Sequence, residues 1–498
     1  MKIIFWLNAF LLFYGLSYNL QKKSDYELYS VVDVTDKTKD FFTNQNLVNF
    51  KKQWFLHDHI KKKSEPDINY LLDFEKRYSI NIWQLGFNER IFYFYNDFYK
   101  FTQNEILSIL EQECKLFENI LDEVKPDFLI IEEPALHQEQ LFYEMCRKKG
   151  IRVLILTHSK LGYRCIIVEQ MHKIDYVSSL NNVASQYHTF EELINELKSY
   201  DSSKQHKLYA KNFGKSKLTK LKAICQYIIS DNSNISSNYA YYGRGKLKVM
   251  VKTLLLLIQS KFRKNYLDRH SVSKIFDNEK YVLFTLNQEP ERSTLIATPL
   301  HTNQLEVIRQ IAKSLPPGYK LYVKEHYSQS LREWRKISFY KELIQIPNVR
   351  LYHPESSMGD LISNSSLVIS TGGSTPFEAA FYKKPSIIFA DYGFTMLPFI
   401  HKLDRLEELP NIIRNALSSI VDPELLGNYL TILKNNIFDF DLVGYYTLEA
   451  NFFRYGGSLH DTKITNEKMQ SFLDSNQSLF ELLTEQYIKK LKQHQSKF

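Results

Sequence analysis

The residues best suited to chemistry lie between Leu367 and Phe389, in the stretch LVISTGGSTPFEAAFYKKPSIIF. An apolar run leads into Ser370-Thr371-Gly372-Gly373-Ser374-Thr375, and Pro376 follows at a position that the first turn of a helix tolerates. Two glycines let the backbone bend and approach a ligand closely. Because hydroxyl groups and the N–H groups of a helix start face one point, this turn predicts a phosphate-binding site.

Glu378 lies just inside the same predicted helix. A carboxylate so close to an anion is unfavourable unless it accepts hydrogen bonds from sugar hydroxyls. The alternative is an ordinary first-turn acid that the helix dipole favours, and the sequence leaves both open.

A second group, Lys324-Glu325-His326, follows the strand-like run Tyr319–Lys324. Lysine and histidine side chains can neutralise a phosphate. Parallel strands bring their carboxyl ends to one edge of a sheet, so we expect Lys324 and His326 beside the Ser370–Thr375 turn.

The elements that position these groups alternate regularly from Tyr281 onward. Predicted helices at about 303–314, 331–344 and 376–382 separate five predicted strands: Tyr281–Leu286, Tyr319–Lys324, Val349–Tyr352, Leu367–Ser370 and Ser386–Phe389. This order predicts a doubly wound parallel sheet.

The N-terminal region shows the same alternation. Its clearest unit is a strand at Phe128–Glu132, a helix at Gln140–Lys149 and a strand at Ile151–Thr157. The run from Ile3 to Leu20 is apolar enough to imitate a signal peptide or an anchor. Its polar residues favour a buried strand, Lys2–Trp6, followed by a helix, with an uncleaved anchor as the alternative.

The fold class that follows is α/β, with two Rossmann-like domains facing a cleft and a helical C-terminal tail. We expect an N-terminal acceptor-side domain at 1–240, a linker at 241–278, a second Rossmann-like domain at 279–430 and C-terminal helices at 431–498. Ser478 and Glu481 have capping-box spacing before the last apolar stripe. The linker contains a basic amphipathic segment, Lys246 to Arg269, which is typical of a helix on an anionic membrane surface or of an interdomain helix with a buried apolar side.

Composition sets outer limits on function. The 498 residues are 44% hydrophobic and include only four cysteines, which excludes a small disulfide-stapled module, a collagen-like fibre and a mainly disordered chain. The cysteines lack zinc spacing and indicate buried free thiols in a reducing compartment. A net charge of +8 over so long a chain favours anionic partners only mildly.

The chain resembles the capsular-polysaccharide biosynthesis glycosyltransferases, GT-B enzymes that include the Kdo transferases of capsule assembly. This resemblance rests on four stretches: VKEH, STGGSTPFEA, the sequence between them, and Gln288 to Ser293. It covers about Tyr281 to Tyr392 well and Lys125 to Arg164 loosely. His326 is similar to the histidine of the "HP" motif in CMP-sugar transferases such as bacterial sialyltransferases, although Tyr327 replaces the usual proline.

The resemblance implies a role for each matching residue. Lys324 and His326 would contact the donor phosphate or nucleotide, Ser370, Thr371, Gly372, Gly373, Ser374 and Thr375 would cradle the phosphate, and Glu378 would hold ribose hydroxyls. The reaction would move a sugar from a nucleotide donor to a surface or capsular polysaccharide or a glycolipid. We expect no metal and no cofactor, since no D-x-D follows a predicted strand.

An acceptor hydroxyl needs a base, which we expect from the opposite half of the cleft. The candidates after Phe128–Ile131 are Glu132, Glu133 and His137, and those after Ile151–Thr157 are His158 and Arg164. We favour Glu133 as the base, with His158 and Arg164 lining the acceptor or donor site.

Alternatives remain within and outside enzymes. The turn is also similar to those of UDP-GlcNAc 2-epimerases and teichoic-acid glycerophosphotransferases, and a non-catalytic nucleotide-sugar-binding scaffold would share the pocket. Expected partners are a nucleotide sugar, a saccharide or lipid-linked saccharide and a peripheral membrane contact, but not nucleic acid. The expected location is the cytoplasm, at the inner face of the membrane if that contact forms.

Overall fold

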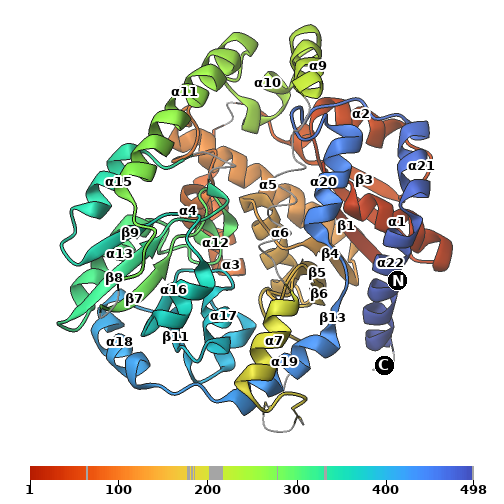
Figure 1. Cartoon of the computed structure of the whole chain (residues 1–498). Coiled ribbons are helices and arrows are strands. Elements are labelled where there is room, and N and C mark those ends of the chain that lie inside the picture. Colours follow the sequence, from red (N-terminus) through yellow and green to blue (C-terminus); the bar gives the residue numbers. More distant parts are fainter. Residues whose placement is uncertain are drawn as a thin grey trace.

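The computed structural model describes residues 1–62, 65–175, 180, 183, 185–200, 217–276, 279–329 and 334–495. Two β-sheets lie in separate halves of the molecule, and helices cover both faces of each (Figure 1). The described strands are β1 (Lys2–Asn8), β2 (Glu27–Asp33), β3 (Lys52–Phe55), β4 (Phe128–Glu132), β5 (Arg152–His158), β6 (Cys165–Val168), β7 (Lys280–Thr285), β8 (Tyr319–Lys324), β9 (Val349–Tyr352), β10 (Leu367–Ser370), β11 (Ser386–Ile388), β12 (Ile400–Lys402) and β13 (Ile437–Phe438).

The first sheet has the order β13-β6-β5-β4-β1-β2-β3, with β1 to β5 parallel and β6 antiparallel to β5. Its helices are α1 (Leu12–Lys23), α2 (Asp36–Asn44), α3 (Ile68–Tyr78), α4 (Ile82–Asn88), α5 (Gln103–Val124) and α6 (His137–Lys148). The predicted strand at Lys2–Trp6 is confirmed as β1, an interior strand between β4 and β2. Residues 3–7 are all apolar, because Ile3 and Phe5 pack against α1 while Ile4 and Trp6 pack against α5 and α6.

The second sheet is entirely parallel and has the order β12-β11-β10-β7-β8-β9. Its helices are α12 (Arg292–Leu295), α13 (Gln304–Ser314), α15 (Ile337–Ile344), α16 (Met358–Asn364), α17 (Thr375–Phe381) and α18 (Leu409–Ser418). Read from β9, the strands follow the Rossmann order, third, second, first, fourth, fifth and sixth, so the direction of winding changes between β7 and β10. The prediction of a doubly wound sheet is confirmed, and so is the wider expectation of two such sheets.

The chain crosses between the halves more than once. After α7 (Phe190–Ser199), the helices α9 (Lys217–Ile229), α10 (Asn234–Ser237) and α11 (Lys246–His270) lead to the second sheet. Then α19 (Pro423–Asn436) leads back, and β13 joins the first sheet beside β6. The final helices α20 (Leu442–Phe453), α21 (Asn466–Ser475) and α22 (Gln477–Gln495) pack on the first sheet, where α22 covers α1.

Several local predictions differ from the structure. The helix predicted at 331–344 is described from Ile337, and residues 331–333 lie outside the described part of the chain. Ser478 is not a cap, because α22 already begins at Gln477. The helix predicted from Gln140 begins at His137, and the helix predicted from about residue 303 begins at Gln304, with Asn303 as its N-cap.

Among the helices that the structure describes, none combines the length and the apolar content needed to cross a lipid bilayer.

Candidate functional site

A cavity of about 800 Å³ lies between the two halves, at the carboxyl ends of strands from both sheets. Lys324 and His326 line it from the end of β8, and Gly372 to Thr375 with Glu378 line it from the turn after β10. Glu133, at the end of β4, and His158, at the end of β5, form part of the opposite wall. The two predicted loops therefore open into one space, beside the point where the winding of the second sheet changes direction.

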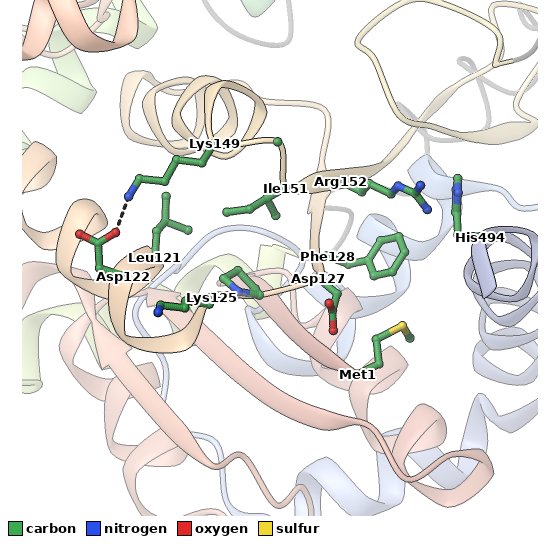
Figure 2. A pocket seen from close by; sticks show the side chains of 12 residues that line it. Met1, Leu121, Asp122, Lys125, Asp127, Phe128, Lys149, Ile151, Arg152 and His494 are labelled. Carbon is green, nitrogen blue, oxygen red and sulfur yellow. Dashed lines mark hydrogen bonds and ion pairs between the residues drawn. The ribbon is translucent and has the colours of Figure 1, made fainter. Parts of the chain in front are cut away.

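A second cavity of similar volume lies at the opposite, amino-terminal ends of β4 and β5 (Figure 2). Several of its charges are already compensated: Lys149 pairs with Asp122, and the Asp127 carboxylate accepts a hydrogen bond of 2.8 Å from the Lys2 backbone N–H. Because doubly wound sheets bind ligands beyond the carboxyl ends of their strands, we take the interdomain cavity as the candidate site.

The glycine-rich turn is shaped by two different requirements. Gly373 has φ +95°, and a Cβ built on it would meet no atom of the described residues within 4 Å. A Cβ on Gly372 would instead come within 3.2 Å of the Ser293 carbonyl oxygen and 3.3 Å of the Asn287 side-chain amide. Gly373 therefore needs glycine for its backbone conformation, whereas Gly372 needs it for close packing.

Buried polar groups brace this turn from below. Ser370 Oγ donates a 2.7 Å hydrogen bond to the Gly372 carbonyl oxygen. The Asn287 side chain, oriented to suit its neighbours, donates to Ser370 Oγ and accepts from Thr371 Oγ1, each over 3.2 Å. Ser370 and Thr371 are fully buried, so they support the cradle, while Gly372 to Thr375 face the cavity.

Glu378 is held inside the turn that follows. Ser374 Oγ donates a 2.6 Å hydrogen bond to the Glu378 carboxylate. Burial raises the pKa of Glu378, and this hydrogen bond opposes the rise only in part. The helix that carries Glu378, α17, is seven residues long, about as short as predicted. Its dipole is therefore a small contribution to anion binding, and most of the attraction must come from the N–H groups of the turn and from Lys324.

Lys324 and His326 present two donors of different kinds. Lys324 is 4% exposed and donates a 2.8 Å hydrogen bond to the Pro354 carbonyl oxygen. Burial lowers the pKa of Lys324 to about 8, so the amine still carries its charge at neutral pH. Burial also lowers the pKa of His326, although the negative charges of Glu291 and Glu325 oppose this by raising it. The Ser328 N–H donates to His326 Nδ1 over 3.2 Å, which leaves the proton of the neutral ring on Nε2 as a donor.

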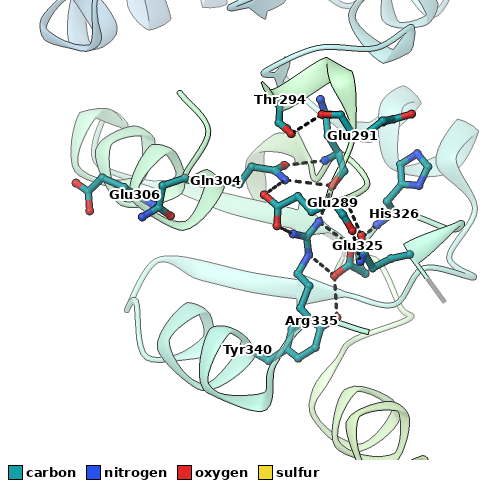
Figure 3. Close-up of polar contacts among 12 residues, drawn as sticks. Glu289, Glu291, Thr294, Gln304, Glu306, Glu325, His326, Arg335 and Tyr340 are labelled. Atoms are coloured by element: carbon teal, nitrogen blue, oxygen red, sulfur yellow. Dashed lines mark hydrogen bonds and ion pairs between the residues drawn. The ribbon is translucent and has the colours of Figure 1, made fainter. Parts of the chain in front are cut away.

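A buried ion cluster fixes the loop that carries His326 (Figure 3). Arg335 donates to Glu325 over 2.9 Å and also pairs with Glu289, and Tyr340 donates to the same Glu325 carboxylate over 2.8 Å. The other Glu325 oxygen accepts a 2.6 Å hydrogen bond from the His326 backbone N–H. Glu325 thus connects the cluster directly to the backbone of the candidate histidine.

The opposite wall is held by a charged bridge between the halves. Arg292, at the start of α12, donates to Glu133 over 2.9 Å and to the Pro134 carbonyl oxygen over 2.7 Å. His172 Nδ1 lies 3.0 Å from the same Glu133 oxygen, and Thr157 Oγ1 donates to the other oxygen over 2.8 Å. Burial would raise the pKa of Glu133, but Arg292, Lys160 and His172 outweigh it and hold the pKa well below its usual value. A carboxylate engaged in this way is a weak base.

The remaining candidates lie elsewhere. Arg164 is not among the residues that line the cavity; its guanidinium donates to Asp439 over 2.5 Å and contacts the Tyr200 hydroxyl. His137 is buried between Glu89 and Glu113, 2.8 Å and 3.0 Å from their oxygens. Glu132 accepts from the Tyr446 hydroxyl, and burial raises the pKa of Glu132 to about 7.

One sequence expectation needs correction, because a D-x-D does follow a strand. Asp439-Phe440-Asp441 comes directly after β13, which the sequence did not predict. Asp439 pairs with Arg164, and Asp441 accepts a 2.8 Å hydrogen bond from the Gly444 N–H at the start of α20. Neither aspartate lines the cavity, and across the described residues no group of three or more potential ligands is arranged to hold a metal ion.

No family model matches the chain, and no curated protein matches its sequence. Solved structures do resemble it. UDP-GlcNAc 2-epimerase from Neisseria meningitidis is 13% identical over 87% of this chain and 99% of its own, with a TM-score of 0.27. KpsC, a β-Kdo 2,4-transferase from Thermosulfurimonas dismutans, is 14% identical over 61% of this chain and 79% of its own, with a TM-score of 0.30. HepE from Anabaena, in complex with UDP and glucose, is 11% identical over 91% of this chain and 98% of its own, with a TM-score of 0.24. Scores this low do not decide the chain's family or activity, so the fold rests on its own strand order.

The sequence analysis gave no role to three residues that line or brace the site: Asn287, Arg292 and Lys160. Asn287 and Arg292 follow β7, the central strand of the second sheet, and this position beside the change in winding was the available signal. Lys160 follows β5 by two residues and carried no separate signal.

Proposed function

We propose that the protein is a metal-independent glycosyltransferase that moves a sugar from a nucleotide donor to a saccharide or lipid-linked saccharide. The observation that carries this proposal is the convergence of Lys324, His326 and the Gly372–Thr375 turn on one side of the interdomain cavity, with His158 on the other. The Lys324 cation and the N–H donors beside it suit a leaving phosphate, and the opposite wall leaves room for an acceptor.

In the proposed reaction, the bond between the sugar carbon and the donor phosphate oxygen breaks, and the nucleotide keeps the electron pair. An acceptor hydroxyl oxygen forms the new bond to the same carbon and gives up its proton. Lys324 and the Nε2–H of His326 stabilise the charge that develops on the leaving phosphate, and fixed donors of this kind supply a large share of rate enhancement in other enzymes.

We assign the role of base to His158 and not to Glu133. The Glu133 carboxylate already accepts hydrogen bonds from Arg292 and Thr157, and its pKa is held far below neutrality. His158 lines the cavity from the end of β5 and is half-buried. Glu133 then acts as a positioning residue that holds Arg292 at the cavity wall.

The donor is tested first by thermal shift with CMP, UDP, GDP and CDP compounds, since a ligand that binds the folded state raises its apparent stability. A response to CMP compounds alone would indicate a CMP-linked donor. Turnover is then followed with and without an acceptor. An epimerase would convert its nucleotide sugar without any acceptor, and a glycerophosphotransferase would need CDP-glycerol.

His326→Ala tests the site itself. We expect kcat to fall roughly 10²-fold with little change in melting temperature, because the variant loses a donor to the leaving phosphate. His401→Ala is the matched control, since His401 lies on β12 and hydrogen-bonds Ser419 over 2.8 Å. Equal turnover of both variants would reject the proposed site.

A further inference from the structure

The helices α9 and α11 expose apolar residues where a globular protein would bury them. On α11, Leu247, Val251, Leu254, Ile258 and Phe262 recur at helical spacing, and each is about half to three-quarters exposed. The sequence left open that Lys246 to Arg269 is an interdomain helix with a buried apolar side, and that interpretation is therefore wrong. The exposed apolar residues of the two helices, together called the α9–α11 face, are Leu218, Leu221, Ile224, Ile228, Ile229, Leu247, Met250, Val251, Leu254, Leu255, Leu257, Ile258 and Phe262.

Contacts on the other side of α11 fix this orientation. Lys248 donates to the Phe98 carbonyl oxygen over 2.6 Å, and Lys252 pairs with Asp97 over 3.1 Å. Nearer the end of the helix, Arg263 donates to the Trp334 carbonyl oxygen over 2.8 Å, and Leu267 is fully buried. The helix is held to the protein by its polar side, so its apolar stripe points outward.

The two helices lie close together at one end of the molecule. Both reach the top of Figure 1, beside α10, and Lys246 on α11 donates to the Ile228 carbonyl oxygen on α9 over 2.8 Å. The exposed apolar residues of both helices therefore lie at the same end of the molecule.

The charges on these two helices are almost all positive. The two helices contain ten lysines and arginines and one acid, Asp268. Lys217, Lys220 and Lys222 on α9 and Lys261 and Lys264 on α11 are exposed. Apolar side chains edged by exposed lysines suit the boundary of an anionic bilayer, where apolar groups enter the acyl region and cations contact phosphate headgroups.

We propose that the α9–α11 face docks on an anionic lipid bilayer and holds the protein at the membrane surface. A second copy of the chain fits this face poorly, because a symmetric contact would place two sets of basic residues against each other. The inference does not depend on the reaction proposed above.

Vesicle flotation tests the proposal with the full-length protein. Vesicles of pure phosphatidylcholine are compared with vesicles that contain about 30% phosphatidylglycerol, at about 0.1 M and 0.5 M salt. We expect binding to the anionic vesicles only, weakened by salt. The triple variant Leu254→Gln/Ile258→Gln/Phe262→Gln should lose at least about tenfold in binding, and Lys217→Gln/Lys220→Gln/Lys222→Gln should lose binding at low salt.

Matched controls come from exposed residues elsewhere on the chain. Leu300→Gln/Ile420→Gln removes two apolar residues that are 78% and 89% exposed, and Lys489→Gln/Lys492→Gln removes two exposed cations on α22. Both controls should bind vesicles as the wild type does. Failure of the wild type to bind anionic vesicles, or unchanged binding by the triple apolar variant, would overturn the proposal.

Cys225 offers a direct second measurement. Cys114, Cys146 and Cys165 are buried and Cys225 is exposed on α9, which corrects the expectation of four buried thiols. A polarity-sensitive dye attached to Cys225 should shift its emission to shorter wavelength with anionic vesicles and not with neutral ones. A dimer in sedimentation that dissociates in the triple apolar variant, with no dye response to vesicles, would instead identify a contact between copies and refute membrane docking.

Discussion

Replacing Lys324 by methionine is expected to stabilise the unliganded protein while it removes nucleotide binding. Lys324 is 4% exposed, and burial lowers its pKa from 10.5 to about 8. This difference corresponds to about 3 kcal/mol of unfavourable free energy for the charged amine at neutral pH. Methionine has a similar shape but gives up the hydrogen bond to the Pro354 carbonyl oxygen, which costs about 1–2 kcal/mol. The net gain in unfolding free energy should be about 1–2 kcal/mol.

The pH dependence of this gain has a definite sign. Between about pH 8 and 10.5 the unfolded chain keeps a proton on Lys324 that the folded protein has lost. The stability of the wild type therefore rises with pH through this window, and Lys324→Met lacks that part of the rise. The variant should be more stable at pH 7, and its advantage should disappear by about pH 10.

Urea unfolding at pH 7 and pH 10, without ligand, measures both quantities, and calorimetry with the nucleotide found by thermal shift measures binding. Lys324→Ala is the control for lost packing, because it removes the charge but also leaves a cavity, and it should be less stable than Lys324→Met. A methionine variant that is less stable than the wild type at pH 7, or one that binds nucleotide normally, would refute the reasoning.

Two further predictions concern the turn and the bridge between the halves. Gly373 and Gly318 both have positive φ with open space for a Cβ, so Gly373→Ala and Gly318→Ala should each lower the unfolding free energy by about 1 kcal/mol. Only Gly373→Ala should weaken nucleotide binding, by roughly tenfold in calorimetry. Equal nucleotide affinities of the two variants would contradict a ligand above the turn. Glu133→Gln should lower the unfolding free energy by about 2–3 kcal/mol at pH 7, because it leaves Arg292 without its counter-ion. Since Glu133 has a lowered pKa, the wild type loses this advantage as pH falls below about 4. Urea unfolding should therefore show a smaller difference in unfolding free energy between the wild type and Glu133→Gln at low pH. A difference that does not change with pH would reject the ion pair as the cause of the destabilisation.

The strands around the candidate site could be predicted because each leaves a complete local pattern. Val368 and Ile369 in β10 and Tyr322 and Val323 in β8 point to opposite faces of the parallel sheet and are buried on both, which requires continuous apolar runs. Once the strands were parallel, their carboxyl ends had to share an edge. The meeting of His326 with the glycine turn in one cavity followed from that topology.

Features that depend on distant contacts could not be predicted in this way. The apolar periodicity of α11 is the same whether its partner is a protein core or solvent, so the sequence did not reveal which way Leu254 and Ile258 point. Glu133 was favoured as a base because nothing in the sequence shows that Arg292, from the other half, would pair with it. The two residues of β13 are too few to show a period, and their partner, β6, lies about 270 positions earlier.

The return of the chain to its starting half has a consequence for biosynthesis. The apolar side of α1 is covered by α22, where Phe480 packs directly over Gly15, and β13 completes the edge of the first sheet. On the ribosome, the second sheet and its helices form one uninterrupted segment that is ready to fold as soon as it emerges. The N-terminal half, which is synthesised first, keeps apolar surface exposed until residues 437–495 have been synthesised. We therefore expect nascent chains stalled before residue 437 to recruit chaperones, although they carry every residue assigned to the cavity except Val443.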